Sequence, residues 1–329
     1  MALFRTALGI DISKGDLVVA RVSHQPVWTV SNTPTGQTAI VAKIGTLDHP
    51  HVILEATGQW HIALCDALAN AGIAYTQVDG YKMRNFARSQ GRRAKTDPVD
   101  ARMLATYGAI IQPEPTTPRP AILRALAALV GRREDLIAHR TREKNRAKST
   151  TAEAVIASVY RITVILAEEI RRVDQQIREL IASDPDTAAR YALLRSVPGW
   201  GPVTATVVLA LLPELGTLTR KQLNALVGVA PYNQESGNHT GSRRIAGGRA
   251  PVRKALYMAT HSGATLCKSP IVRAHVAALQ DRGKPYKVAI IATVNRMLGI
   301  VNAMVRDNLR WEETAASHGL GTIPSRVPV

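Results

Sequence analysis

Four prolines within nine residues constrain this chain more than any other feature. They lie in the segment QPEPTTPRP, residues 112–120. Proline has no backbone N–H group, so it is excluded from helix interiors and from the central strands of a sheet. The segment therefore predicts a linker or a domain edge. A chain of 329 residues has room for two or three domains.

Before this segment, strand-like runs alternate with helical spacing. Strands are expected at residues 6–12, 16–23, 27–32, 51–55 and 73–78. Residues 60–71 have helical spacing that stops at Gly72, and residues 98–111 are also helical. Residues 80–94 hold many basic side chains and almost no apolar face, which indicates a loop or a mobile helix. This order predicts an α/β domain with a mixed sheet.

After the prolines the pattern becomes helical. Apolar residues recur every three or four positions over residues 121–183, which predicts two long helices. They would pair as a hairpin or coiled coil, or simply pack on flanking domains. Further helices are expected at residues 203–212, 219–227, 253–267 and 286–306. Residues 231–252 are rich in Gly, Asn and Arg and predict an irregular loop. The expected domains are therefore residues 1–111, 112–189 and 190–329.

Charge is concentrated at the C-terminal end. The whole chain carries a formal charge of +17, and residues 190–329 hold 18 basic and six acidic side chains, a net +12. Such an excess favours a polyanion partner, because neutralising phosphates releases counterions. A solubilising surface is the alternative. Aromatic residues make up only 4% of the chain, which argues against a base-stacking platform of interleaved aromatics.

Compartment signals point to the cytoplasm. The two cysteines, Cys65 and Cys267, are too far apart in sequence to indicate a disulfide framework or a zinc site. The N-terminus lacks the pattern of a signal peptide. The longest apolar run, residues 203–212, is too short to span a bilayer. No membrane partner is expected.

Four carboxylates occupy unusual positions. Asp11 interrupts an apolar strand, and Glu55 ends another. Asp97 and Asp100 are three residues apart at a helix start, which puts them on one helix face. Converging carboxylates would bind two hard divalent cations, and Mg²⁺ suits such oxygen ligands. Each also has an ordinary alternative: a turn residue for Asp11, an ion pair for Glu55, and an N-cap for Asp97.

A glycine hairpin forms a second motif. Gly199 and Gly201 lie in the sequence PGWG between two expected helices. Glycines allow the backbone to approach a phosphate, and the next helix N-terminus offers free N–H groups, as in a helix-hairpin-helix clamp. Contacts of this kind would carry no base specificity. A plain interhelical turn is the alternative.

These motifs together resemble one known family. GIDI (9–12), EATG (55–58) and KTDPVDA (95–101) closely resemble the DEDD, RuvC-like domain of insertion-sequence-110 family transposases. VPGWG (197–201), GVAPYN (228–233), ESG (235–237) and GGR (247–249) resemble the same family's second domain. The resemblance covers residues 6–310. It implies an α/β RNase H-like N-terminal domain, a helical or coiled-coil middle, and a mostly helical C-terminal domain with a helix-hairpin-helix-like element.

The resemblance also implies roles for particular residues. Asp11, Glu55, Asp97 and Asp100 would hold Mg²⁺ (or Mn²⁺), and Ser236 would be the nucleophile that joins a DNA phosphate. By sequence alone, Ser236 is a serine in a flexible loop without an evident histidine base. Basic side chains would hold phosphates or attract the backbone nonspecifically; they are Arg243, Arg244, Arg249, Arg253, Lys254 and Lys95.

The partners follow from the same resemblance. They are donor and target DNA, a structured noncoding bridge RNA that pairs with both, and further copies of the chain, with dimers assembling into a tetramer. The expected activity is RNA-guided strand exchange through a serine–DNA phosphodiester, assisted by a divalent metal, at the nucleoid of a bacterium or archaeon. Guidance by base pairing fits a highly charged chain without an evident base-reading helix.

Two other functions use the same features differently. A Mg²⁺-dependent, RuvC-like Holliday-junction nuclease would use the four carboxylates with water as nucleophile and would not need Ser236. A nonenzymatic nucleic-acid scaffold would need only the hairpin and the basic domain. An actin-like sugar kinase also opens with a sequence like GIDIS, but its glycine-rich phosphate loops are missing here.

Overall fold

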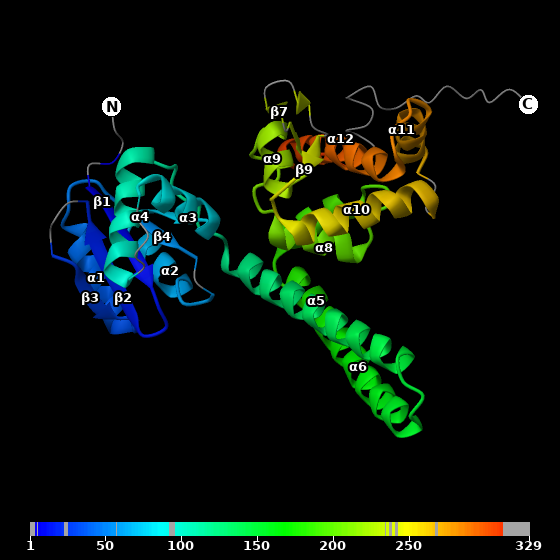
Figure 1. Ribbon diagram of the computed structural model, residues 1–329, viewed down its shortest axis with the longest axis horizontal. Coiled ribbons are helices and arrows are strands. Elements are labelled where there is room, and N and C mark those ends of the chain that lie inside the picture. Colours follow the sequence, from blue (N-terminus) through cyan, green and yellow to red (C-terminus); the bar gives the residue numbers. More distant parts are fainter. Residues whose placement is uncertain are drawn as a thin grey trace, which may run out of the picture. The chain divides into compact units, whose positions relative to one another are not determined.

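The computed structural model describes residues 4, 6–22, 26–56, 58–91, 96–233, 235–236, 239–240, 243–266 and 269–311. The chain forms two compact units, Met1–Pro118 and Arg119–Val329. The first is an α/β unit and the second is almost entirely helical (Figure 1). The boundary falls within the proline segment, as its composition predicts. The finer division at residues 111 and 189 stays a prediction.

A five-stranded mixed sheet forms the centre of the first unit. Its strands run in the order β3–β2–β1–β4–β5. Their bounds are β1 (Thr6–Ile12), β2 (Asp16–Arg21), β3 (Trp28–Ser31), β4 (Pro50–Glu55) and β5 (Ala74–Val78). β1 pairs antiparallel with β2 and parallel with β4. The expected mixed sheet is therefore confirmed, and the order is compatible with an RNase H-like domain.

Helices cover both faces of this sheet. The helices α1 (Pro34–Gly45) and α2 (Ile62–Asn70) share a core with Leu8 and Ile10 of β1. On the opposite face lie α3 (Gly80–Ser89) and α4 (Asp97–Ile111), packed around Ile53 of β4. Successive side chains of a strand point to opposite faces, so each strand supplies both cores.

Two of these helices differ from the sequence expectation. α1 was not expected; Thr33 caps its first turn, and Ile40 and Ile44 are buried in the core below it. α3 was expected as a loop or mobile helix. It is a helix because Met83 is buried and Phe86 packs edge-on against Tyr107 of α4, with ring centroids 5.2 Å apart. Two apolar residues are enough to hold α3 in place because they pack against α4.

The proline segment lies along the outer edge of the sheet. The backbone N–H of Thr116 donates to the carbonyl of Tyr75 (2.7 Å), and the Thr116 hydroxyl accepts from the N–H of Gln77 (2.9 Å). The Thr76 hydroxyl donates to the carbonyl of Glu114 (2.8 Å). The segment therefore covers the edge of β5, which would otherwise expose unpaired backbone groups.

A long helical hairpin opens the second unit. α5 (Ala121–Lys148) and α6 (Glu153–Ala182) pack through apolar residues that include Val130 and Val173. Arg133 Nε donates to Asp174 Oδ1 across the pair at 2.6 Å. The predicted pairing of two long helices is confirmed as a hairpin.

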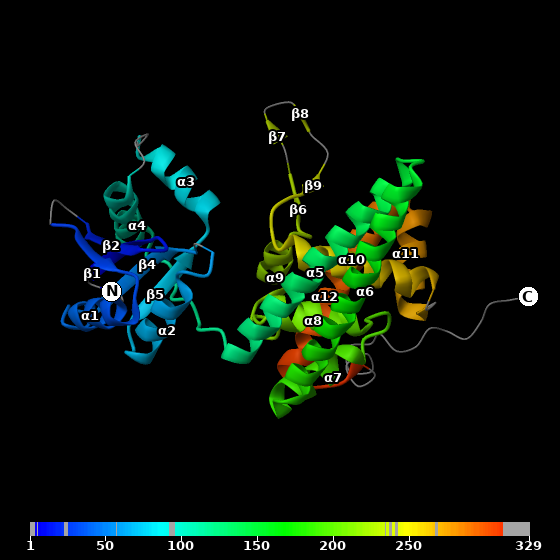
Figure 2. The same cartoon turned by 90° about the horizontal axis from the view of Figure 1, so that it is seen from below.

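The remaining helices form the body of the second unit (Figure 2). They are α7 (Pro185–Arg195), α8 (Pro202–Leu211), α9 (Arg220–Val227), α10 (Ala250–Thr265), α11 (Pro270–Asp281) and α12 (Tyr286–Asp307). α8 is buried along nearly its whole length. α11 was not expected. α12 is the one described helix long and apolar enough to cross a membrane, and 61% of its most apolar window is buried inside the unit.

A small β-ribbon replaces the irregular loop expected at residues 231–252. β6 (Pro231–Tyr232) pairs antiparallel with β9 (Arg244–Ile245), and β7 (Glu235–Ser236) pairs antiparallel with β8 (His239–Thr240). In Figure 2, β7 and β8 lie beyond β6 and β9, away from the helices of this unit. The expectation of irregular structure was wrong for these paired residues, which backbone pairing organises without a strand pattern in the side chains, while described residues such as 246–249 have no regular structure.

Candidate active site

Strand alternation places Asp11 and Glu55 on the same face of the sheet. Both lie at the edge formed by the carboxyl-terminal ends of β1 and β4. Register pairs Ile10 of β1 with Leu54 of β4, so Asp11 and Glu55 follow at neighbouring positions. Both lie two residues after a position, Gly9 or Ile53, that faces α4. Their side chains therefore share the face that α4 covers. Parallel pairing of β1 with β4 therefore brings Asp11 and Glu55, which are far apart in the sequence, close together.

α4 brings the other two carboxylates to this edge. Thr96 stands at the N-cap, so Asp97 begins the helix and Asp100 completes its first turn. Acidic side chains in a first turn are favoured by the helix dipole. The helix rests directly on β1, because a Cβ on Gly9 would lie 1.9 Å from the carbonyl oxygen of Ala101. Only glycine permits this approach.

Glu55 lies against the start of α3. A Cβ on Gly80 would lie 2.4 Å from Glu55 Oε1, so a larger residue at the first position of α3 would displace the Glu55 carboxylate. The Asp79 carboxylate caps the helix and accepts from the N–H of Tyr81 at 2.8 Å. A helix was one of the two alternatives expected for this segment, whereas its contact with Glu55 was not expected.

The pKa of Asp11 reflects its burial and the acidic side chains around it. Burial and, after it, the negative charges of Asp97 and Asp100 raise the pKa of Asp11 from 3.8 to about 6, with a smaller contribution from Glu55. A hydrogen bond to the backbone of Ile12 acts in the opposite direction. Like charges in a partly buried place disfavour the ionised form of each other. Glu55, Asp97 and Asp100 therefore all lie within electrostatic reach of Asp11.

The donor set suits a hard divalent cation. Within the part of the chain that the structure describes, no three His, Cys, Asp or Glu side chains are arranged closely enough to hold an ion as they stand. All four acids offer oxygen ligands, which Mg²⁺ prefers, and a cation would relieve the repulsion that raises the Asp11 pKa. The residues fit such an ion if the carboxylates move closer together as it binds.

Ser236 lies on the ribbon of the second unit. Its backbone pairs with that of His239 across β7 and β8. Directly opposed residues of an antiparallel pair are cross-strand neighbours. Sequence spacing alone did not reveal this register, since it depends on where the ribbon turns.

Two arginines fix the base of this ribbon. Arg253 Nη1 donates to the carbonyls of Val227 (3.2 Å) and Gly247 (2.6 Å). Val227 comes before the ribbon in the sequence and Gly247 comes after it. Arg249 binds the carboxylate of Glu214 through both terminal nitrogens, each at 2.6 Å. Glu214 was not singled out in the sequence. The structure thus gives these guanidinium groups internal partners in addition to any phosphate.

The other predicted phosphate contacts are more exposed. Arg243 and Arg244 lie on the surface at the β9 strand. Lys254 Nζ is 2.9 Å from Glu134 of α5, in a largely exposed ion pair. Lys95 lies outside the described residues. The phosphate contacts of these four residues stay predictions.

The glycine hairpin has a packing role that the sequence did not show. Gly199 has φ +83°, and a Cβ there would lie 2.9 Å from the Ala259 carbonyl oxygen of α10. Gly201 has no neighbouring atom within 4 Å of that position. Gly199 therefore lets the turn between α7 and α8 pack on α10, while Gly201 stands at the open N-cap of α8. Their binding to phosphate stays a prediction.

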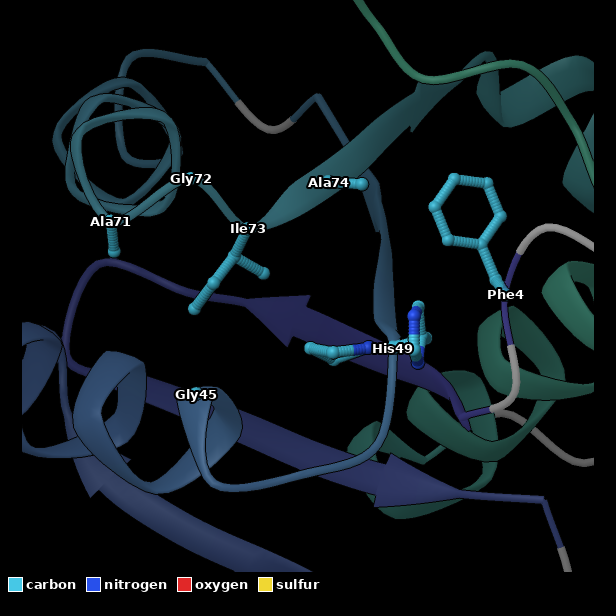
Figure 3. A pocket seen from close by; sticks show the side chains of 8 residues that line it. Phe4, Gly45, His49, Ala71, Gly72, Ile73 and Ala74 are labelled. Atoms are coloured by element: carbon cyan, nitrogen blue, oxygen red, sulfur yellow. The ribbon is translucent and has the colours of Figure 1, made fainter.

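A surface cavity lies at the opposite edge of the sheet. Figure 3 shows Phe4, His49 and Ile73 around it, and Pro50 and Ala74 also line it. The last two begin β4 and β5, whereas Glu55 ends β4. The cavity is therefore separate from the carboxylate edge.

Comparison with known proteins identifies the relationship of the chain. A family model described as "Transposase", of the DEDD type, matches residues 8–156. A second model, described as "Transposase IS116/IS110/IS902 family", matches residues 191–277. The two matches cover both units, with the carboxylate motifs in the first match and Ser236 in the second.

Two curated relatives align over nearly their whole length. The Pilin gene-inverting protein of Moraxella lacunata is 28% identical over 328 residues, which cover 94% of this chain and 98% of the relative. The protein of the same name from Moraxella bovis is also 28% identical, with the same coverage. An insertion element IS110 protein of Streptomyces coelicolor is 26% identical over 49% of this chain and 39% of its own length. The chain belongs to the IS110 family of transposases.

Proposed function

We propose that this chain is a DNA recombinase that exchanges strands between a donor and a target DNA. The main support is the group of four carboxylates at one sheet edge, where burial and then the charges of the neighbouring acids raise the Asp11 pKa to about 6. Strongly perturbed acids gathered at one place are typical of functional sites. The full-length similarity to Pilin gene-inverting proteins favours recombination over general DNA scaffolding.

The proposed reaction uses Ser236 as nucleophile. Its Oγ forms a bond to a DNA phosphorus as the bond from phosphorus to the departing deoxyribose oxygen breaks. The serine proton passes to solvent, and the departing oxygen takes up a proton. Attack by the hydroxyl of another strand reverses these steps and releases the serine. The covalent ester conserves the phosphodiester bond, so no external energy source is required.

The carboxylates would assist this step. Asp11, Glu55, Asp97 and Asp100 would hold Mg²⁺ or Mn²⁺. Such an ion, when bound, polarises a phosphate and stabilises charge on its oxygens. The residues of this chain would set where the ion lies, because β1 and β4 supply one carboxylate each and α4 supplies two to the same edge.

Guidance by a structured RNA is part of the proposal. The support is the charge of +17 and the excess of basic residues after residue 190. Two polyanions, DNA and RNA, would share this surface. We expect the bridge RNA to select both donor and target by base pairing.

Self-association completes the proposal. The first half of α6 exposes large apolar side chains, and such patches commonly mark protein interfaces. These residues are Val155, Ile156, Tyr160, Ile162, Val164 and Ile165. Pairing of hairpins from two copies would bury them. Dimers and then a tetramer would allow the carboxylates and the serine of different copies to act together.

A covalent-adduct assay tests the proposal. The full chain is mixed with its RNA and with donor and target DNA, and protein–DNA adducts are resolved on a denaturing gel. Ser236→Ala should abolish both adduct and exchange while DNA binding persists. Ser149→Ala, at the C-cap of α5, is the matched serine control and should behave as wild type. Cleavage by Ser236→Ala at the wild-type rate would contradict the serine step and favour the water-dependent junction nuclease.

A further inference from the structure

The exposed face of α3 is a charged surface that the proposed reaction leaves unused. Three basic residues and no acidic residue occur among its ten positions. Lys82, Arg84 and Arg88 are all exposed. Among the described residues, none forms an ion pair or a hydrogen bond with the side chains of these three; of Lys82, only the backbone N–H bonds to the capping Asp79. Other arginines of the chain, such as Arg190 and Arg195, donate instead to internal carbonyls at 2.6 Å.

The helix holds this face in a fixed position relative to the carboxylates. On its inner side, Met83 and Phe86 pack against α4, the helix that also carries Asp97 and Asp100. Figure 2 shows α3 and α4 on the same side of the sheet. At its first residue, Gly80 contacts the Glu55 carboxylate closely. The outer face therefore starts at the carboxylate edge and leads away from it.

An exposed aromatic side chain stands where this face begins. Tyr81 is 67% exposed and follows Gly80 directly. Tyr81, Arg84 and Arg88 are spaced three and four residues apart, so they share one face of the helix. From Tyr81 to Arg88 the helix rises about 10 Å at 1.5 Å per residue, the length of about three nucleotide steps.

We propose that α3 binds an unpaired stretch of the reacting DNA strand beside the carboxylates, with Tyr81 stacking on a base and Lys82, Arg84 and Arg88 contacting phosphates. The inference rests on the proposed function in taking the carboxylate edge as the reaction centre. Charge complementarity selects a polyanion, and an aromatic ring next to cations suits an unpaired base. A paired base would offer no face for Tyr81 to stack on. These are positioning contacts, and they carry little sequence preference.

Binding of fluorescent 20-nucleotide probes to the full chain tests the proposal directly. Stacking on one aromatic ring contributes enough that Tyr81→Leu should weaken single-stranded DNA binding about 5- to 150-fold. Tyr81→Phe, which keeps the ring, should bind like wild type. Duplex DNA of the same sequence should bind both variants equally. Thermal unfolding of each variant confirms that the fold is intact, as expected for an exposed position.

The charge contribution is tested by salt dependence. Arg84→Gln with Arg88→Gln should reduce the log–log salt slope by about 1.4, or ~0.7 for each lost phosphate contact. The charge-matched control is Arg171→Gln with Arg172→Gln on the exposed side of α6, and it should leave the slope unchanged. An equal reduction in both double variants would overturn the proposal, because it would indicate a general effect of net charge.

Other outcomes are equally decisive. Wild-type DNA binding by Tyr81→Leu, or a selective loss of RNA binding instead of DNA binding, would refute a DNA-strand site on α3. These assays need no catalysis. A chain that shows the expected binding but forms no serine adduct would therefore contradict the proposed function and leave the α3 site in place.

Discussion

Replacing Gly9 with alanine should pull the carboxylate cluster apart. Gly9 lies in β1 two residues before Asp11, on the face covered by α4. The added methyl group would point at the helix that carries Asp97 and Asp100. The variant therefore perturbs the site without altering any of its four carboxylates.

The structure gives the size of this effect. The new Cβ would lie 1.9 Å from the Ala101 carbonyl oxygen and 2.4 Å from the Ala105 nitrogen, while ordinary contacts begin near 3.4 Å. α4 must therefore move by about 1.5 Å, since backbone atoms cannot rotate away. Overpacking typically costs about 1–3 kcal/mol, and rigid neighbours put this site near 3. At ~4 °C per kcal/mol, the Tm of the first unit should fall by about 12 °C.

Function should suffer more than stability. A displacement of about 1 Å at a catalytic site can cost about 100-fold in rate, and strand exchange should fall by that order. The affinity for Mn²⁺, followed by titration calorimetry of the full chain, should fall as well. Greater separation from Asp97 and Asp100 should also move the Asp11 pKa back toward 3.8, because the repulsion that raises it weakens.

Gly15→Ala is the matched control. Gly15 lies in the turn between β1 and β2, and nothing lies within 4 Å of its Cβ position. Its Tm, Mn²⁺ affinity and exchange rate should equal those of wild type. If Gly9→Ala kept wild-type Tm and Mn²⁺ affinity, the close packing of α4 on β1 would not be what sets the carboxylate geometry.

Three further predictions concern other parts of the molecule. Asp11→Asn should retain DNA binding, measured by anisotropy, and lose strand exchange, because one proposed metal ligand and its charge are removed; undiminished exchange would refute the proposed metal role. Glu214→Gln should lower the yield of serine adduct more than DNA affinity, because it weakens both hydrogen bonds from Arg249 at the base of the ribbon; equal losses would indicate a general folding defect. Burial lowers the pKa of His51 to about 4, so below pH 6.5 the unfolded chain binds this proton more readily than the folded one. This residue should therefore remove roughly 3 kcal/mol of stability as pH falls from 6.5 to 4, at 1.36 kcal/mol per pH unit. Denaturant unfolding should show a shallower acid loss in His51→Gln, and identical pH profiles would contradict it.

Burial keeps His51 neutral, and its hydrogen bonds determine which ring nitrogen carries the proton. The imidazole is 1% exposed, and its Nε2 lies 2.8 Å from the Thr76 hydroxyl. That hydroxyl donates its only proton to the carbonyl of Glu114. Nε2 must therefore carry the hydrogen and donate it to Thr76. The pairing links β4, β5 and the proline segment through one buried contact.

Local sequence patterns determined much of the first unit. Short apolar runs predicted its strands, and four prolines predicted its boundary. Asp11 and Glu55 drew attention because a charge in an apolar strand is costly without a purpose. These signals are local, since each depends on residues within a few positions of one another.

Other features could not be read in this way because they depend on distant partners. α3 has a weak apolar face and is a helix only because α4 receives Met83 and Phe86. The β-ribbon depends on backbone pairing, which leaves little trace in side-chain type. Arg249 and Arg253 resembled phosphate ligands in sequence, and the structure gives them Glu214 and backbone carbonyls as partners.

By itself, the sequence determined which features are candidates for the chemistry: four carboxylates in unusual positions and an excess of positive charge, with Ser236 added only by the family resemblance. The tertiary structure alone decided which of them meet. Parallel pairing of β1 with β4 and the close approach of α4 at Gly9 bring the acids to one edge. The physical reason is that side-chain chemistry is a property of each residue, whereas proximity depends on packing between segments far apart in the chain.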